Sequence, residues 1–86
     1  NQWADPLIEQ LEKCTFRDGT EEEFLALLKQ IDAKSDPKAI EYLTIILKRE
    51  VIGKSFSEQV QREAVDALER LGPAGVDVLI DIVVQN

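Results

Sequence analysis

The stretch VQREAVDALERLGPAGVDVLI, residues 60–80, carries the clearest structural pattern in this 86-residue chain. Its first half repeats apolar residues at the three- and four-residue spacing of one helix face, at Val60, Ala64, Ala67, Leu68 and Leu71. The pair Gly72-Pro73 follows, and glycine is typical of the end of one helix as proline is of the start of the next. The stretch therefore predicts two helices joined by a tight corner.

Both halves of this stretch repeat earlier parts of the sequence. "VDVL" at 76–79 matches "IEYL" at 40–43 and "IEQL" at 8–11, and each copy follows a proline by two or three residues. Four apolar positions of the 60–71 helix have counterparts forty residues earlier, at Phe24, Leu27, Leu28 and Ile31. The first, third and fifth predicted helices are thus of one type, and the second and fourth are of another. Repeats of this length, built from two helices, are typical of α-solenoids.

The first three helices are predicted from their start and stop signals. Asp5-Pro6 predicts the start of a helix that ends near Cys14. Thr20-Glu21-Glu22-Glu23 is a capping box, and it predicts a second helix over about residues 21–33. Ser35-Asp36-Pro37 repeats the Asp-Pro start and predicts a third helix that ends near Glu50.

Two further helices complete the prediction. Ser55-Phe56-Ser57-Glu58 is interpreted as a second capping box in front of the fourth helix. The fifth helix is predicted to reach the end of the chain, with an apolar stripe at Val76, Leu79, Ile80 and Val83. The predicted fold is all-α: a right-handed α-solenoid of about five antiparallel helices, half a repeat plus two helical pairs, in one domain over residues 1–86. Because the chain contains no methionine, it is expected to be processed or to be a piece of a longer protein.

Residues 57–84 resemble a HEAT-type repeat, especially its short bacterial form. In that family the first helix carries Val, Ala, Ala-Leu and Leu-Gly at the spacing seen at 60–72, and the second carries Val-x-x-Leu-Ile as at 76–80. Residues 20–50 match less well, because Phe24 replaces the alanine and the loop between the helices is four residues longer. The resemblance implies a HEAT-like or armadillo-like scaffold for protein–protein contact, and some bacterial members resemble subunits of chromophore lyases for phycobiliproteins.

Composition narrows the possible functions. The chain has 17 acidic and 10 basic residues, a net charge of −7, and no histidine. Nucleic acids and anionic membranes attract basic surfaces, so we expect neither as a partner, and a protein with a basic surface fits better. The missing histidine removes the usual general base and the commonest metal ligand, and the single cysteine, Cys14, is interpreted as a packing residue. We predict no catalytic, cofactor or metal site.

Acidic residues recur at one position of the first-type helices. Glu9, Glu41 and Asp77 share that position, and Asp81 lies one turn beyond Asp77. In a stack these side chains would line up along one face and could bind a basic peptide or a basic protein surface. The alternative is that they form the solvated side of amphipathic helices.

The fifth helix is unusually apolar, with Asp77, Asp81 and Gln85 as its polar residues after residue 75. Such a helix requires cover on more than one side, whereas a terminal repeat normally has a polar outer face. Ile80 and Val84 are therefore predicted contacts with a missing neighbouring repeat, a partner or a second copy of the chain.

Three hypotheses about function follow. The first is a non-enzymatic protein-interaction module made of HEAT-like helical pairs. The second is an enzyme subunit, such as part of a chromophore-lyase-like complex, that needs a partner chain for its chemistry. The third is a compact five-helix adaptor domain in which the sequence repetition is fortuitous.

Overall fold

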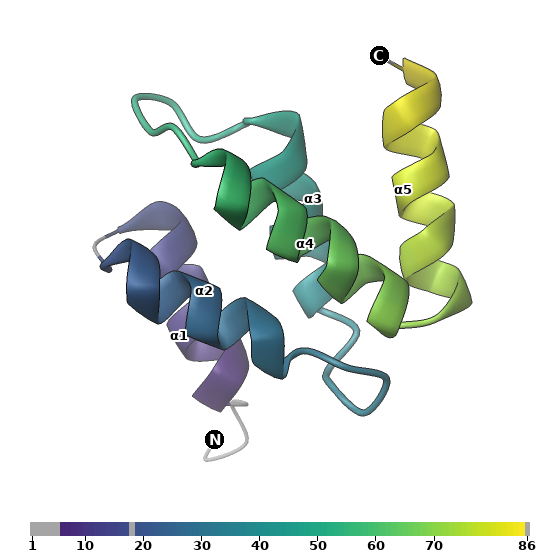
Figure 1. Cartoon of the computed structure of the whole chain (residues 1–86), viewed down its shortest axis with the longest axis horizontal. Coiled ribbons are helices and arrows are strands. Elements are labelled where there is room, and N and C mark those ends of the chain that lie inside the picture. The colour runs from purple at the N-terminus through teal and green to yellow at the C-terminus, as the bar shows by residue number, and fades with distance from the viewer. Residues whose placement is uncertain (1–5, 18, 86) are drawn as a thin grey trace.

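The computed structural model describes residues 6–17 and 19–85, and within them all regular secondary structure is helical (Figure 1). The prediction of an all-α fold is therefore confirmed, and Asp5, the predicted cap of the first helix, lies outside the described residues. The elements are α1 (Pro6–Phe16), α2 (Glu21–Gln30), α3 (Ala39–Lys48), α4 (Glu58–Arg70) and α5 (Pro73–Gln85).

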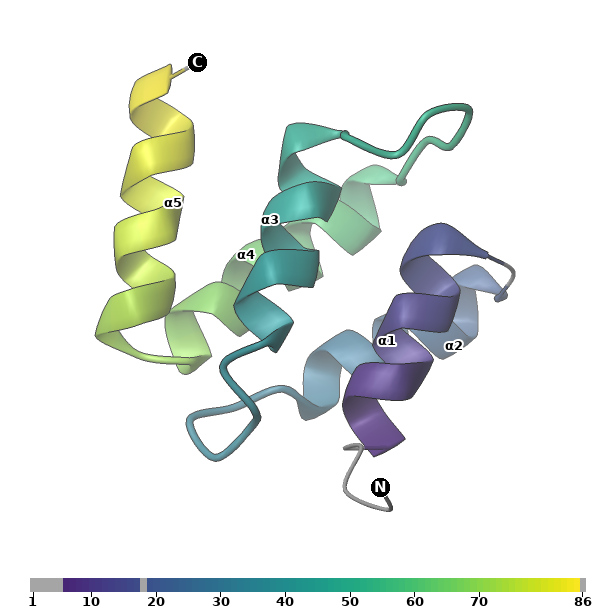
Figure 2. The same ribbon diagram turned by 180° about the vertical axis from the view of Figure 1, so that it is seen from behind.

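The helices form two layers. One layer contains α1, α3 and α5, each in contact with the next, and the other contains α2 and α4 (Figures 1 and 2). The layers are joined because α1 contacts α2, and α4 contacts both α3 and α5. Helix α1 contacts neither α4 nor α5, and α2 contacts neither α3 nor α5. The α1–α2 hairpin thus packs on the α3–α4 hairpin, and α5 packs on the far side of the second hairpin.

The start of α2 has the capping box that the sequence predicts. The Glu23 N–H donates to Thr20 Oγ1 at 3.1 Å, and the Thr20 N–H donates to Glu23 Oε1 at 3.0 Å. These hydrogen bonds favour the carboxylate and lower the pKa of Glu23. Because the folded pKa lies below the unfolded one, the contribution of the cap is present above the unfolded pKa and is lost as pH falls through the folded pKa.

The predicted capping box of α4 is wrong, because the helix begins two residues later than expected. Ser57, and not Ser55, is the cap: its Oγ accepts a hydrogen bond from the Val60 N–H at 3.2 Å. The reason is hydrophobic, since the preceding Phe56 is buried and packs edge-to-face on Phe24, with ring centroids 5.8 Å apart.

The connection between α2 and α3 is longer than predicted, because α2 ends at Gln30 and α3 begins at Ala39. Short polar side chains bind the backbone here and compete with helical hydrogen bonds. Asp32 accepts from the Lys34 N–H at 2.8 Å, and Asp36 accepts from the Lys38 N–H at 2.9 Å. Two helix C-termini also differ from the prediction. Helix α1 continues past Cys14 to Phe16, and α3 ends at Lys48, two residues before Glu50.

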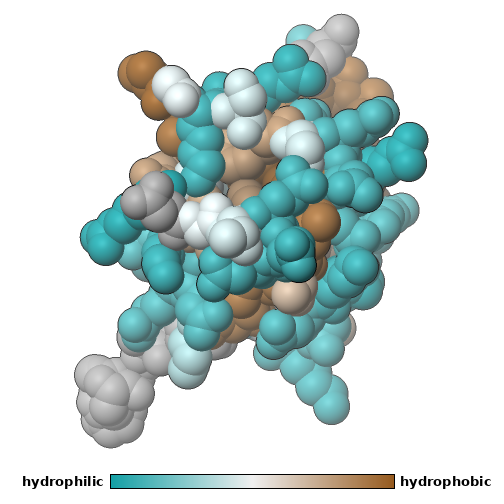
Figure 3. Space-filling view, turned by 60° about the vertical axis from the view of Figure 1, so that its left-hand side comes forward, coloured by the Kyte–Doolittle hydropathy of each residue, from teal (hydrophilic) through white to brown (hydrophobic). Residues whose placement is uncertain are grey.

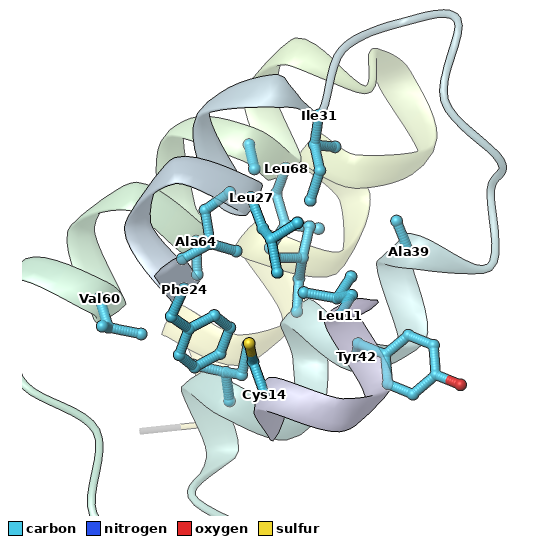
Figure 4. Packing of buried hydrophobic residues seen from close by; sticks show 14 of the residues in the cluster. Leu11, Cys14, Phe24, Leu27, Ile31, Ala39, Tyr42, Val60, Ala64 and Leu68 are labelled. Atoms are coloured by element: carbon cyan, nitrogen blue, oxygen red, sulfur yellow. The ribbon is translucent and has the colours of Figure 1, made fainter. Parts of the chain in front are cut away.

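The core lies between the two layers, and side chains from four helices point toward one another there (Figure 4). The forty-residue repetition is visible in the burial: Leu27 and Leu28 of α2, and their counterparts Ala67 and Leu68 of α4, are all buried. The equivalent leucines of the first-type helices, α1, α3 and α5, are not all buried to the same extent. Leu11 of α1 and Leu43 of α3 are fully buried, but the equivalent Leu79 of α5 is half-buried.

A very close contact at the corner between α4 and α5 determines how α5 packs. Gly72 has a φ of +97°, which favours glycine. Gly75 is buried, and a Cβ atom at this position would lie 2.0 Å from the carbonyl oxygen of Leu68. Only glycine therefore allows the first turn of α5 to lie this close to the last turn of α4.

Two basic side chains of the second hairpin bind the open carboxyl ends of the first. Arg70 donates from Nε to the Ile31 carbonyl at 2.7 Å and from Nη2 to the Leu28 carbonyl at 2.8 Å, at the end of α2. Lys54 donates to the carbonyls of Cys14 and Arg17, at the end of α1. The carbonyls at the end of a helix have no partner within the helix, and the helix dipole places negative charge there. These contacts therefore fix one hairpin on the other.

The difference in burial between Leu43 and Leu79 predicts different effects of truncation. Leu43→Ala should lower the free energy of unfolding by about 2–5 kcal/mol, because a fully buried leucine leaves a cavity. Leu79→Ala should cost clearly less, because its side chain already meets solvent. Urea unfolding of the two variants measures this difference, and equal losses would contradict the half-buried position of Leu79.

Arg70→Ala should destabilise the protein by about 1.5–3 kcal/mol, because two hydrogen bonds from a charged group are lost. The Ile31 carbonyl loses its arginine donor, and the Leu28 carbonyl keeps only the Ile31 N–H at 3.2 Å. Arg62→Ala is the matched control on the same helix, since Arg62 makes only an exposed ion pair with Glu58 at 3.7 Å. That variant should change stability by less than about 1 kcal/mol. Equal thermal midpoints for the two variants would show that the Arg70 contacts do not hold the hairpins together.

Candidate partner-binding surface

The described residues contain no group of three or more histidine, cysteine, aspartate or glutamate side chains that could hold a metal ion. Cys14 is buried in the core, and its sulfur points into the cluster around Phe24 (Figure 4). Burial, with the nearby Glu23 carboxylate, raises the pKa of the Cys14 thiol. A neutral, covered thiol is a poor nucleophile, so Cys14 has the character of a packing residue.

The four acidic residues singled out in the sequence are all exposed. Glu9, Glu41 and Asp77 lie on α1, α3 and α5, the consecutive members of one layer. Asp81 accepts a hydrogen bond from Gln85 Nε2 of its own helix at 3.3 Å. The structure thus places the acids on neighbouring helices, in the solvated positions that either hypothesis for them requires. Their role in binding stays a prediction.

The apolar surface of α5 is the largest departure from an ordinary solvated helix. Four of its aliphatic side chains are exposed: Val76 at 38%, Ile80 at 56%, Val83 at 71% and Val84 at 75%. They lie at positions i, i+4, i+7 and i+8, which is one continuous helix face. We call these four residues the α5 face. The sequence predicts Ile80 and Val84 as contact residues, and it places Val76 and Val83 on the apolar stripe of the helix without assigning them to a contact.

The apolar stripe that the sequence predicts at Val76, Leu79, Ile80 and Val83 does not lie in the core: Leu79 is half-buried and the other three residues are exposed. Helix α5 instead buries Gly75 and Ile82, and it half-buries Val78 and Leu79. The physical reason is the contact of Gly75 with the Leu68 carbonyl, which fixes the rotation of α5 about its axis. The spacing of the valines was visible in the sequence, but the glycine contact that decides which apolar stripe turns inward was not.

The α5 face borders a groove between α4 and α5 of about 400 Å³. Val65 and Glu69 of α4 form one side of this groove, and Leu79 and the α5 face form the other. Glu69 is the only charged residue in its lining. In Figure 1, α5 is the outermost helix, at the opposite end of the molecule from α1 and α2.

The side of the molecule that Figure 3 brings forward has a different character. Hydrophilic residues cover most of this side, and hydrophobic ones are visible mainly in recesses between them (Figure 3). Among the described residues, the large hydrophobic side chains that are exposed are Phe16, Ile52 and the four residues of the α5 face, so four of the six lie together on one helix.

Comparison of the chain with protein-family models, curated proteins and solved structures gave no match. In the part of the chain that the structure describes, no helix is long and apolar enough to cross a membrane.

The buried position of Cys14 predicts slow alkylation. Iodoacetamide at neutral pH should modify the native thiol far more slowly than the thiol of the chain unfolded in urea, because the raised pKa keeps it neutral and the core covers it. Mass spectrometry of timed samples measures both rates. Alkylation of the native protein as fast as that of the unfolded chain would mean that the thiol is accessible and available for chemistry.

Proposed function

We propose that this chain is a non-enzymatic protein-interaction module that binds another protein through the α5 face. The observation that carries this proposal is the exposure of four aliphatic side chains on one helix face beside an apolar groove. Exposed aliphatic residues are common singly, but a contiguous stripe of them is characteristic of a contact surface. Burying the stripe under a partner would remove it from water, which is the main favourable term in protein association.

We further propose that the five helices form a short stack of HEAT-like pairs. Two observations support this part of the proposal. Contacts occur only between adjacent members of each layer and between layers at neighbouring helices, as in a stack. The core positions of α2 and α4 also coincide at the forty-residue spacing.

The non-enzymatic part of the proposal has its support in the residues themselves. The sequence has no histidine, and its one cysteine is buried with a raised pKa. Nucleophilic and acid–base catalysis both depend on accessible groups with suitably placed partners. No specific observation favours the enzyme-subunit hypothesis or the adaptor-domain hypothesis over the interaction module.

The acidic residues are the competing surface, and the α5 face is the better candidate. Exposed carboxylates such as Glu9 and Glu41 are well solvated and need no partner. Exposed valines gain from being covered. In this proposal Glu9, Glu41 and Asp77 contribute long-range attraction to a basic partner, which raises the association rate more than the affinity.

A comparative capture experiment tests the proposed function. The parent protein, Val84→Glu, and the triple variant Glu9→Gln, Glu41→Gln, Asp77→Gln are immobilised and exposed to extract of the source organism. Proteins held by the parent and the triple variant but lost from Val84→Glu are expected, because a charge on the α5 face opposes its burial. Quantitative mass spectrometry identifies them.

The thermal stability of the variants is the control for this experiment. All four positions are exposed, so each variant should melt within a few degrees of the parent, since surface substitutions change stability by about 0.5 kcal/mol. Capture that is lost in the triple variant and kept in Val84→Glu would move the binding surface to the acidic residues. Capture that neither variant changes would contradict both surfaces.

A further inference from the structure

The internal repetition of the chain shows what kind of element fits the open groove. Helix α2 is already covered by α4, and the seam between them is a hollow lined by Leu25 and Lys29 of α2 and by side chains of α4 that include Glu63. At the forty-residue spacing, Val65 is the counterpart of Leu25 and Glu69 is the counterpart of Lys29. Val65 and Glu69 line the open α4–α5 groove. Helix α4 therefore presents to this groove the same positions that α2 presents to α4.

We propose that the α4–α5 groove binds a single amphipathic helix of a partner protein, which lies along α4 as α4 lies along α2 and places a lysine or arginine against Glu69. This proposal rests on the proposed function and specifies the chemistry of the partner. The apolar side of the bound helix covers the α5 face, and its basic residue takes the place that Glu63 of α4 has in the inner seam.

The charge of the groove is the first argument for a basic helix. In the inner seam Lys29 of α2 shares a hollow with Glu63 of α4, and Arg62 of α4 lines the same hollow. At the open groove the residue equivalent to Lys29 is acidic, so the complementary residue has the opposite sign. Helix α5 adds the exposed carboxylates of Asp77 and Asp81 and has no basic residue. The charges on α5 and Glu69 in the groove therefore all attract a cation.

The size of the surface is the second argument. The four side chains of the α5 face expose on the order of 400 Å² together, which is the size of a single functional patch on a monomer. A stable dimer of globular proteins commonly buries about 800 Å² on each partner. The patch matches one helix laid in a groove, as in other helix-in-groove complexes.

A second copy of this chain fits the surface less well. A symmetric contact through α5 would bring Asp77 and Asp81 of one copy toward those of the other, between two molecules that each carry a net charge of −7. Like charges across an interface cost free energy and suppress the wrong pairing. The occupant we infer is therefore a basic amphipathic helix and not the protein itself.

Two synthetic peptides test this inference, and both derive from the helix that serves as the template. The first is residues 57–71 of this chain with Glu63→Lys, and the second is the unmodified 57–71 sequence. Each peptide is labelled with a fluorophore and titrated with the parent protein, Glu69→Lys and Val84→Glu at low ionic strength, with fluorescence anisotropy as the measurement. Circular dichroism melts of the two protein variants confirm that they fold.

The lysine peptide should bind the parent about threefold to tenfold more tightly than the unmodified peptide, the range expected for exchanging a repulsive for an attractive exposed pair. Glu69→Lys should reverse this preference, and added salt should diminish it. Val84→Glu should weaken the binding of both peptides, because both need the α5 face.

Other outcomes overturn the inference in distinguishable ways. Equal affinity of the two peptides for the parent, with loss of both in Val84→Glu, would refute the pairing with Glu69 and leave the proposed function standing. No binding of the lysine peptide at about 1 mM protein, or binding that Val84→Glu does not change, would refute the bound helix. Sedimentation of the parent as a dimer that Val84→Glu dissociates would identify the occupant as a second copy.

Discussion

The contact between Gly75 and the Leu68 carbonyl is the constraint on which the proposed binding surface depends. A Cβ atom at position 75 would lie 2.0 Å from that oxygen, so the first turn of α5 can lie against the end of α4 only because residue 75 is glycine. The contact also sets which side of α5 turns inward, and it leaves Val83 and Val84 in solvent. The exposed stripe is thus a consequence of tight packing in the first turn of α5 and not of a loosely packed terminal helix.

The first four helices are held in a different way from α5. Arg70 and Lys54 reach from the second hairpin to the carboxyl ends of α2 and α1, so each helix of the first hairpin has a cation at its negative end. The described part of α5 has no lysine or arginine, and its buried residues are few. Of the five described helices, α5 has the fewest buried residues, so a bound partner of the proposed kind would stabilise it.

The sequence predicted the helices well and the surface only in part. Apolar spacing located all five helices, and Thr20 with Glu23 located the start of α2, because these signals are local. The local signal at Ser55 gave a wrong N-cap for α4. Phe56 is buried, and the helix is capped by Ser57 instead. The orientation of α5 could not be predicted, since Val76, Ile80 and Val83 form as good a stripe as Ile82 with its half-buried neighbours. The contact of Gly75 in α5 with the Leu68 carbonyl in α4 decides which stripe faces the core, and the apolar spacing within α5 does not predict that contact.

The same repetition that predicted the fold also limits what can bind. Leu25 of α2 and Val65 of α4 are equivalent, but Leu25 lines the hollow between α2 and α4, whereas Val65 lines the groove between α4 and α5. If the two grooves accepted the same kind of helix, α4 of one molecule could compete for the groove of another. The change from Lys29 to Glu69 opposes that exchange, because Glu63 of a second α4 would meet a like charge. A partner helix of the kind we propose, with a basic residue at that place, would avoid the repulsion, so one difference between the two equivalent positions would both favour a foreign helix and disfavour the chain's own.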